Sequence, residues 1–229
     1  MNTKFDSALA TLSFIGVGGG QLSVGPGHSV APPGAFALAC KRACDIAASI
    51  IAIPFIVVAG VFLAALNPVW NPGPLLYRQT RMGKDCKPFT AIKFRSMRCA
   101  GGQSRGPGDP VEKHRITPLG RFLRRNRIDE LPQFFNIIRG EMSLIGPRPD
   151  FWEHAVHFVD SVPGYRERHV VKPGLTGLAQ VHLGYAEGVE ATFRKVRHDL
   201  DYIRRMRPSL ELAILWRTVV VVTTGFGAR

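Results

Sequence analysis

The sequence predicts a mainly helical α+β protein that is attached to a membrane through one apolar segment near its N-terminus. Residues 46–66 contain no charged side chain, and a run of this length can cross a bilayer as a helix. Amphipathic helical patterns and one hairpin pattern follow it. The chain has 30 Lys and Arg against 17 Asp and Glu, for a formal net charge of +13. This balance suits an anionic partner, which could be nucleic acid, a lipid surface or a phosphorylated substrate.

Residues 1–40 differ in composition from the rest of the chain. They are poor in charge and rich in Gly, Ser, Ala and Pro, with Gly18-Gly19-Gly20 and Pro32-Pro33 among them. This composition predicts a flexible segment. A signal peptide is disfavoured because Lys4 is offset by Asp6 and glycine interrupts the modest apolar stretch.

Residues 41–72 form the predicted membrane segment and the turn that ends it. Pro54 lies near the middle, where a proline removes a backbone hydrogen bond and kinks a helix. Both flanks carry cations, namely Lys41, Arg42, Arg78 and Arg81, and positive charge tends to stay on the cytoplasmic side. We therefore predict a Pro-kinked re-entrant helix that turns at Ile53-Pro54 within one leaflet; a spanning helix is the alternative.

Residues 73–229 are predicted to form the cytoplasmic domain, which begins with a small β-hairpin. Its strands are expected at residues 75–79 and 88–95, with a turn at 83–85. Alternate residues of a strand point the same way, so Lys93 and Arg95 should share a face. Two such cations could meet a diphosphate, although a solvated polar face is the alternative.

Two further segments have amphipathic helical patterns. Residues 119–127, LGRFLRRNR, follow a Gly- and Pro-rich loop predicted at 100–112. An apolar band from Leu210 to Val222 follows a cluster of arginines near the C-terminus. Both patterns suit helices that lie in the membrane interface, and a packed core helix is the alternative for each.

The carboxylates Asp129 and Glu130 stand just before a predicted short helix. The helix is expected to begin at Pro132 and to end at Gly140, because apolar residues recur between them at helical spacing. At a helix N-terminus, unpaired N–H groups and the dipole favour ionised carboxylates, which could act as a nucleophile or hold a cation. The alternative is that Asp129 only caps the helix.

Other site classes lack support in the sequence. The four cysteines have no CxxC spacing, so neither structural zinc nor a disulfide framework is predicted. The seven histidines form no ligand pattern. The arginine cluster would suit nucleic acid, but no RNP, helix-turn-helix or zinc-finger pattern accompanies it, so we predict no nucleic-acid partner.

From Lys41 to about Thr224 the sequence resembles the bacterial sugar transferase family, the monotopic phosphoglycosyl transferases that start glycan assembly on polyprenyl phosphate. The resemblance rests on motifs in a fixed order. These are Lys41-Arg42 with Asp45, the Pro-broken apolar segment, Gly73-Pro74 with Arg78-Gln79, Arg81-Met82-Gly83, Lys93-Phe94-Arg95-Ser96-Met97, Asp129-Glu130-Leu131-Pro132-Gln133, residues 142–149 (MSLIGPRP), residues 172–180 (KPGLTGLAQ), and Asp199 with Tyr202.

The resemblance implies transfer of a sugar 1-phosphate from a UDP-sugar to undecaprenyl phosphate, with release of UMP, at the start of exopolysaccharide or other glycan assembly. By this resemblance Asp129 is the nucleophile that forms a covalent phosphosugar intermediate, and Glu130 assists with Mg²⁺, for which both are candidate ligands. The expected location is the cytoplasmic face of the bacterial inner membrane. The expected partners are the donor, the polyprenyl phosphate acceptor and membrane lipid, and a homo-oligomer is compatible with this assignment.

The resemblance also implies roles for residues outside the pair. Lys93, Arg95 and Arg124 are candidate contacts to the donor phosphates, and Asp199 is a candidate second acidic position near the metal or substrate. Arg148 is favoured on physical grounds too, because the flanking prolines restrict its backbone and would hold the guanidinium fork at little entropic cost. A rigid surface turn is the alternative for Arg148.

The sequence also departs from the family pattern. A Gly-Arg-Asn-like piece that follows the Ala-Gln-Val segment in many members is replaced here by residues 181–188 (VHLGYAEG), and Glu211 stands where an Asp is usual. We expect this chain to hold the catalytic core without the N-terminal membrane spans of the longer family forms. A basic, membrane-bound binding or scaffold protein that keeps this fold without catalysis is the alternative function.

Overall fold

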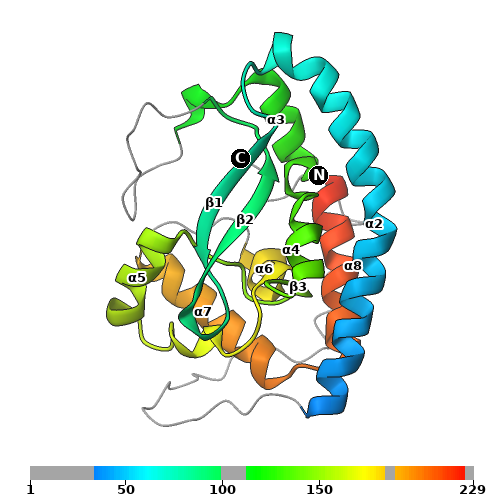
Figure 1. Ribbon diagram of the computed structural model, residues 1–229. Coiled ribbons are helices and arrows are strands. Elements are labelled where there is room, and N and C mark those ends of the chain that lie inside the picture. Colours follow the sequence, from blue (N-terminus) through cyan, green and yellow to red (C-terminus); the bar gives the residue numbers. More distant parts are fainter. Residues whose placement is uncertain (1–33, 99–111, 184–188, 225–229) are drawn as a thin grey trace, which may run out of the picture.

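The computed structural model describes residues 34–98, 112–183 and 189–224 (Figure 1). The loop predicted at 100–112 lies outside this range except for Glu112, as does the predicted flexible segment up to residue 33. The part of that segment that is described was predicted wrongly, because a helix already begins at Ala35.

The described chain is mainly helical, as predicted. The helices are α2 (Ala35–Trp70), α3 (Pro118–Arg125), α4 (Gln133–Arg139), α5 (Trp152–Ser161), α6 (Leu178–Leu183), α7 (Val189–Arg204) and α8 (Pro208–Thr224). Short 3₁₀ turns are η1 (Lys84–Cys86), η2 (Lys113–Arg115), η3 (Ile128–Glu130) and η4 (Glu167–His169). The strands are β1 (Leu76–Met82), β2 (Pro88–Phe94), β3 (Ser143–Ile145) and β4 (Gly174–Thr176).

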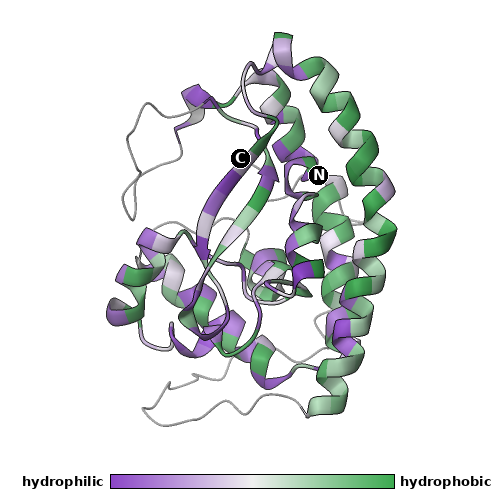
Figure 2. Cartoon of the chain, in the orientation of Figure 1, coloured by the Kyte–Doolittle hydropathy of each residue, from purple (hydrophilic) through white to green (hydrophobic). Residues whose placement is uncertain are grey.

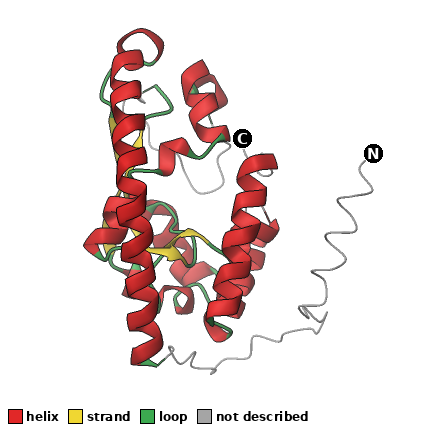
Figure 3. Cartoon of the chain, turned by 90° about the vertical axis from the view of Figure 1, so that its right-hand side faces the viewer, coloured by secondary structure: helices red, strands yellow, loops and turns green. Residues whose placement is uncertain are grey.

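Helix α2 runs along one side of the domain for its full length (Figures 1 and 3). Its buried residues, Asp45, Ser49, Ile56, Leu63 and Asn67, recur at helical spacing and form one stripe that faces the domain. Most of its other apolar side chains are exposed, and Figure 2 shows the hydrophobic colour along the helix. By length and composition α2 could cross a membrane, and only 17% of its most apolar window is buried.

The helix continues through Pro54 without a reversal of the chain. The turn predicted at Ile53-Pro54 is therefore absent, although the proline stands inside the helix as expected. A proline costs a helix one hydrogen bond and a local clash, which a bend can absorb without ending the helix. Figure 1 shows α2 curving around the domain.

Two small sheets lie beside α2. Strands β1 and β2 form the predicted antiparallel hairpin, with Tyr77 opposite Lys93. Strands β3 and β4 pair in parallel, with Ser143 opposite Gly174. A Cβ atom at Gly174 would lie 2.1 Å from the backbone nitrogen of Gly146, so the close approach of these strands requires glycine.

The buried apolar residues form two clusters. The larger one joins α5, α7, α8 and β3 and includes Tyr165, Val196, Ile203 and Ile214. The smaller one joins α2 to β2 and α3 through Ile56, Leu63, Phe94 and Leu123. Full burial of such an aliphatic or aromatic side chain contributes about 1.5–3 kcal/mol. Helix α2 is therefore part of the folded core as well as an apolar surface.

The two predicted amphipathic helices were expected to be either interfacial or packed on the core, and each has features of both. In α8, Ile214 is buried in the larger cluster, whereas Leu212, Trp216 and Val219 are exposed. In α3, Leu123 is buried while Phe122 is 56% exposed. Each helix thus packs on the core by one face and presents apolar side chains on another.

Candidate active site

The carboxylates Asp129 and Glu130 lie in η3, which precedes α4. Arg127 adopts a left-handed conformation with φ of 56° and starts this tight turn. Pro132 is the N-cap of α4, so the helix begins one residue later than predicted, and Gly140 ends it with φ of 83°. No side chain caps the N-terminus. The interpretation of Asp129 as the helix cap is therefore wrong.

Asn136 fixes α4 against the hairpin. This residue is fully buried within the apolar run of the helix. Its side-chain oxygen accepts the Ile92 amide at 3.1 Å, and its nitrogen donates to the Thr90 carbonyl and to Glu141, both at 2.7 Å. Sequence reasoning missed Asn136; the available signal was a lone amide between Phe135 and Ile137 in an otherwise apolar run.

Glu130 is buried among cations. Lys93 Nζ lies 2.7 Å and Arg148 Nη2 2.5 Å from its Oε1, and Arg127 lies 3.7 Å from Oε2. Burial alone would raise the pKa of Glu130, but Arg148 and Lys93 outweigh it and hold that pKa well below its usual range. Glu130 is therefore ionised, and its oxygens are engaged.

Asp129 is the contrasting member of the pair. It is only 7% exposed, and its Oδ1 has no hydrogen-bond partner among the described residues. Burial raises its pKa, the neighbouring charge of Glu130 adds to the rise, and Lys93 and Arg124 oppose it. A buried, unpaired carboxylate oxygen is costly for a fold, so this oxygen is available for chemistry or for a bound ion.

Lys93 and Arg148 are held in place by their surroundings. Burial lowers the pKa of the Lys93 ammonium to about 8, against the opposing effect of Glu130. The backbone around Arg148 is fixed by Arg168, which donates to the Arg148 carbonyl at 2.7 Å, and by Arg81, which donates to the Pro149 carbonyl at 2.7 Å. We call Asp129, Glu130, Lys93 and Arg148 the site cluster.

The remaining predicted residues are placed differently. Arg124 donates to Met97 Sδ at 3.1 Å and is near enough to lower the pKa of Asp129. Arg95 lies beyond the end of β2, and its guanidinium bonds the carbonyls of Asn71 and Pro74 at the turn after α2. The structure therefore does not bring Arg95 to the carboxylate pair, because its guanidinium bonds the turn after α2 whereas Lys93 bonds Glu130.

Asp199 belongs to a second buried ionic group, which we call the support cluster: Asp150, Arg168, Lys195 and Asp199. Arg168 is fully buried and lies 2.8 Å from Asp199 and 2.7 Å from Asp150. Lys195 lies 2.5 Å from Asp150. The contacts of Asp199 therefore lead to Arg168 and only through it to the Arg148 backbone, and the structure does not bring Asp199 to the carboxylate pair.

The site cluster fits a metal ion only in part. The described residues contain no group of three or more His, Cys, Asp or Glu side chains that could hold a metal. Mg²⁺, however, is commonly bound by one or two carboxylates together with substrate phosphates and water. The unpaired Oδ1 of Asp129, beside Glu130, fits such an incomplete set of ligands.

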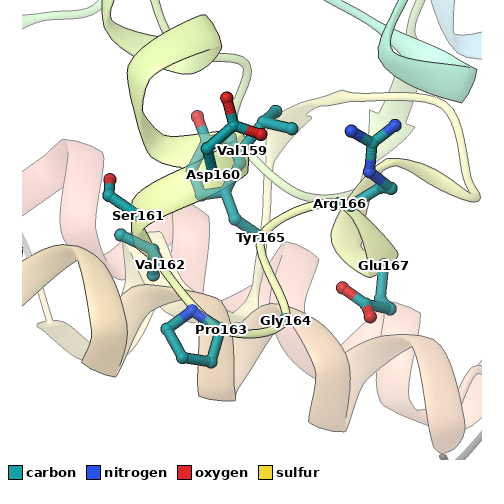
Figure 4. Close-up of a pocket in the computed structure, with 9 residues that line it drawn as sticks. All are labelled: Val159, Asp160, Ser161, Val162, Pro163, Gly164, Tyr165, Arg166 and Glu167. Atoms are coloured by element: carbon teal, nitrogen blue, oxygen red, sulfur yellow. The ribbon is translucent and has the colours of Figure 1, made fainter.

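Two hollows flank the described domain. A groove of about 390 Å³ is lined by apolar residues of α2, β1, β2 and α4, with Arg78 and Arg139 among them. Pro132, two residues from Glu130, forms part of its wall. A second hollow of about 300 Å³ is lined by one continuous segment from Val159 to Glu167, which includes the end of α5 and the first residue of η4 (Figure 4). Neither hollow is lined by a residue of the site cluster, but the groove reaches closer to the carboxylates in sequence, through Pro132.

Two known proteins that are similar to this chain are named as sugar phosphate transferases that act on undecaprenyl phosphate. The UDP-N-acetylgalactosamine-undecaprenyl-phosphate N-acetylgalactosaminephosphotransferase of Aeromonas hydrophila is 42% identical over 190 residues, which cover 82% of this chain and 45% of the relative. The UDP-glucose:undecaprenyl-phosphate glucose-1-phosphate transferase of Escherichia coli K12 is 38% identical, covering 72% and 38% respectively. The chain thus spans less than half the length of these two relatives.

A shorter relative matches over almost its whole length. The exopolysaccharide production protein PSS of Rhizobium leguminosarum bv. phaseoli is 37% identical over 193 residues, covering 80% of this chain and 94% of the relative. The family model of the bacterial sugar transferases matches residues 36–225. This range includes the site cluster and all of α2 except Ala35. The chain belongs to the bacterial sugar transferase family.

Proposed function

We propose that this protein transfers a sugar 1-phosphate from a UDP-sugar to undecaprenyl phosphate, through a covalent intermediate on Asp129. The observation that carries the proposal is the unpaired Oδ1 of Asp129, buried next to an ionised Glu130 and two partly buried cations, Lys93 and Arg148. The names of the relatives support the two substrates. The sugar stays open, since those names include both N-acetylgalactosamine and glucose.

The proposed reaction has two displacements at one phosphorus. In the first, an Asp129 oxygen attacks the phosphorus that carries the sugar, the bond between the two donor phosphates breaks, and UMP leaves. In the second, an oxygen of undecaprenyl phosphate attacks the same phosphorus and the bond to Asp129 breaks, which restores the carboxylate. A covalent intermediate allows a soluble donor and a lipid acceptor to use one site in turn.

The cations of the site cluster suit this chemistry. Phosphoryl transfer depends mainly on positioning and on stabilising the charge of the phosphate oxygens. Lys93 and Arg148 both contact Glu130, and a diphosphate would compete for the same donors. Arg148 would keep its positive charge to a higher pH than Lys93. Contact with Glu130 raises the pKa of Arg148 despite burial, whereas burial lowers the pKa of Lys93.

The carboxylate pair would also hold Mg²⁺. Asp129 would contribute its unpaired oxygen, and Glu130 would contribute in place of one of its present cation contacts. When bound, the ion would neutralise charge on the donor phosphates. Addition of a chelator should then abolish UMP release, and restored Mg²⁺ should recover it.

We further propose that the protein is monotopic, with both ends of α2 at the cytoplasmic face of the inner membrane. Both ends of α2 bind the same domain: Arg42 bonds the carbonyls of Ile137 and Ile138, and Asn71 bonds that of Arg95 at 2.8 Å. A spanning helix would draw the charged domain into the bilayer alongside it, at high cost. Labelling of Cys40 and Cys86 from each side of the membrane tests this, and exposure on opposite sides would contradict it.

The groove beside Pro132 would receive the lipid acceptor. Its apolar walls continue the exposed apolar face of α2, and Arg78 and Arg139 could attract an anionic head group. Hydrocarbon could thus pass from the bilayer to the site cluster without crossing water.

The decisive test is chemical trapping. Purified protein with Mg²⁺ and a UDP-sugar labelled with ³²P in the sugar-linked phosphate, without acceptor, should carry label on the peptide that contains Asp129. Addition of undecaprenyl phosphate should discharge it. Lipid-linked product without any adduct would contradict the covalent mechanism, and binding of donor without UMP release would support a non-catalytic binding protein.

A further inference from the structure

The N-terminal part of α2 contacts two segments that carry the site cluster. Arg42, in the second turn of α2, donates to the carbonyl oxygens of Ile137 at 2.5 Å and Ile138 at 2.8 Å. These carbonyls belong to the last turn of α4, where the dipole favours a cation, and that of Ile137 also accepts the Gly140 amide at 2.9 Å. An arginine from a helix 95 residues away in sequence thus completes the helix that follows Asp129-Glu130.

Asp45, one turn further along α2, holds the second segment. Its Oδ1 accepts the backbone amide of Leu144 at 2.9 Å, and the residue is 4% exposed. Ser143 and Ile145 pair with β4 on one edge of β3, so the Leu144 amide points to the opposite edge. Asp45 satisfies this otherwise unpaired donor, and four residues later the same strand leads to Arg148.

We propose that Arg42 and Asp45 are positioning residues, which set the distance between the carboxylate pair and Arg148 by fastening α4 and β3 to one rigid helix. This inference rests on the function proposed above. The two side chains are three residues apart and lie on one face of α2. That helix is also the proposed membrane anchor. The same element would therefore fix both the position of the protein in the bilayer and the geometry of the site cluster.

Conservative substitutions separate this role from general support of the fold. Asp45→Asn keeps an oxygen that can accept the Leu144 amide, whereas Asp45→Leu keeps the size and loses the acceptor. Arg42→Lys keeps the charge but lacks the fork that reaches two carbonyls. We expect Asp45→Asn to retain kcat within about twofold. Asp45→Leu should lose roughly 10- to 100-fold in kcat with little change in donor KM, because misplacing a site by about 1 Å can cost 100-fold.

Lys41→Met is the matched control. Lys41 adjoins Arg42 and pairs with Glu211 of α8 at 2.8 Å, so the variant removes one charge and one interhelical contact without removing a bond to α4 or β3. It should retain a kcat close to that of the unaltered protein. If Lys41→Met and Asp45→Leu lower kcat equally, or if Asp45→Asn is as inactive as Asp45→Leu, the positioning role is wrong.

Hydrogen exchange tests the contact without any assay of activity. In the unaltered, membrane-reconstituted protein the Leu144 amide should exchange slowly although it lies at a sheet edge. Exchange at this amide should rise at least tenfold in Asp45→Leu and stay low in Asp45→Asn. Fast exchange in the unaltered protein overturns the inference. Absence of any phosphosugar adduct in a protein with a protected Leu144 amide would instead contradict only the proposed function.

Discussion

The site cluster and the support cluster are both buried ionic groups, and they meet at Arg148, yet they differ in how completely their charges are paired. In the support cluster Arg168 bonds two carboxylates and a backbone carbonyl. In the site cluster Glu130 takes the cation contacts, and Asp129 keeps an unpaired oxygen. Under the proposed function, the incompletely paired group does the chemistry and the completely paired group holds it in place.

The pKa values show the same difference. In the site cluster, the pKa of Asp129 is raised chiefly by burial and that of Glu130 is held low by Arg148 and Lys93. In the support cluster, Lys195 and Arg168 overcome burial and hold the pKa of Asp150 far below its usual range. Burial raises that of Asp199 although Arg168 opposes the rise. A raised pKa is therefore common to Asp129 and Asp199, and the unpaired oxygen is what distinguishes Asp129.

Substitution of the reactive carboxylate should have the largest effect. Asp129→Asn should lower UMP release by about 10⁴-fold or more, as loss of a covalent nucleophile commonly does. Its thermal stability should be unchanged or higher, because a buried carboxylate with a raised pKa no longer has to be desolvated. UMP release and thermal unfolding measure the two effects. Normal turnover of a pure preparation would contradict the assignment of Asp129.

Substitution in the support cluster should mainly lower stability. Arg168→Met leaves Asp150 and Asp199 without their buried partner, and loss of one member of such a pair typically costs about 3–5 kcal/mol. We expect this loss in the free energy of unfolding from denaturant titration. Arg124→Met, which removes a cation near Asp129 whose donor contact is to Met97 Sδ, is the comparison. If the two variants lose equal stability, the structural role assigned to the support cluster is wrong.

The pH dependence of kcat/KM should reflect the site cluster. Asp129 must be ionised to attack, so activity should rise with pH through its raised pKa, at a higher pH than for an ordinary aspartate near 3.9. Lys93 should act as a cation, so activity should fall as pH rises through about 8. Lys93→Arg should move that alkaline limb upward. An unmoved limb would assign it to another group.

The smallest expected effect concerns the groove, which lies closer in sequence to the site cluster than to the support cluster. A Cβ at Gly60 would lie 3.7 Å from the Phe94 ring, an ordinary contact, so Gly60→Ala should be tolerated. Gly60→Leu should fill part of the groove and raise the KM for undecaprenyl phosphate by about tenfold, in line with the effect of small apolar groups in a pocket. The rate of Asp129 labelling by donor should not change. An unaltered acceptor KM would place the lipid elsewhere.

Much of the local structure could be predicted from the sequence. The hairpin and α4 were predicted because periodicity and Gly or Pro signals are local. The carboxylate pair was found in the same way. The contacts of Arg95 and Asp199 could not be predicted, since which cation meets which acceptor depends on packing between distant segments. Asn136 and Arg168 were missed for the same reason, as each acts through residues that lie tens of positions away in the chain.

Two larger features of the fold also lay beyond local reasoning. The pairing of β3 with β4 joins two three-residue strands that are too short to give a pattern. The continuous path of α2 through Pro54 depends on the domain against which the helix packs, since Ile56 and Leu63 belong to the same cluster as Leu123. Proline predicts a break from local sequence alone. Here the helix is packed against the domain both before and after Pro54, and it continues.

The inner stripe of α2 sets a limit on protein engineering. Because Ile56 and Leu63 complete a core with Phe94 and Leu123, excising the helix to obtain a water-soluble fragment would uncover that core and release the contacts of Arg42 and Asp45. A soluble version is better obtained by substituting exposed apolar residues of α2 with polar ones. Ile51, Val58 and Val61, which are 68%, 69% and 68% exposed, are examples.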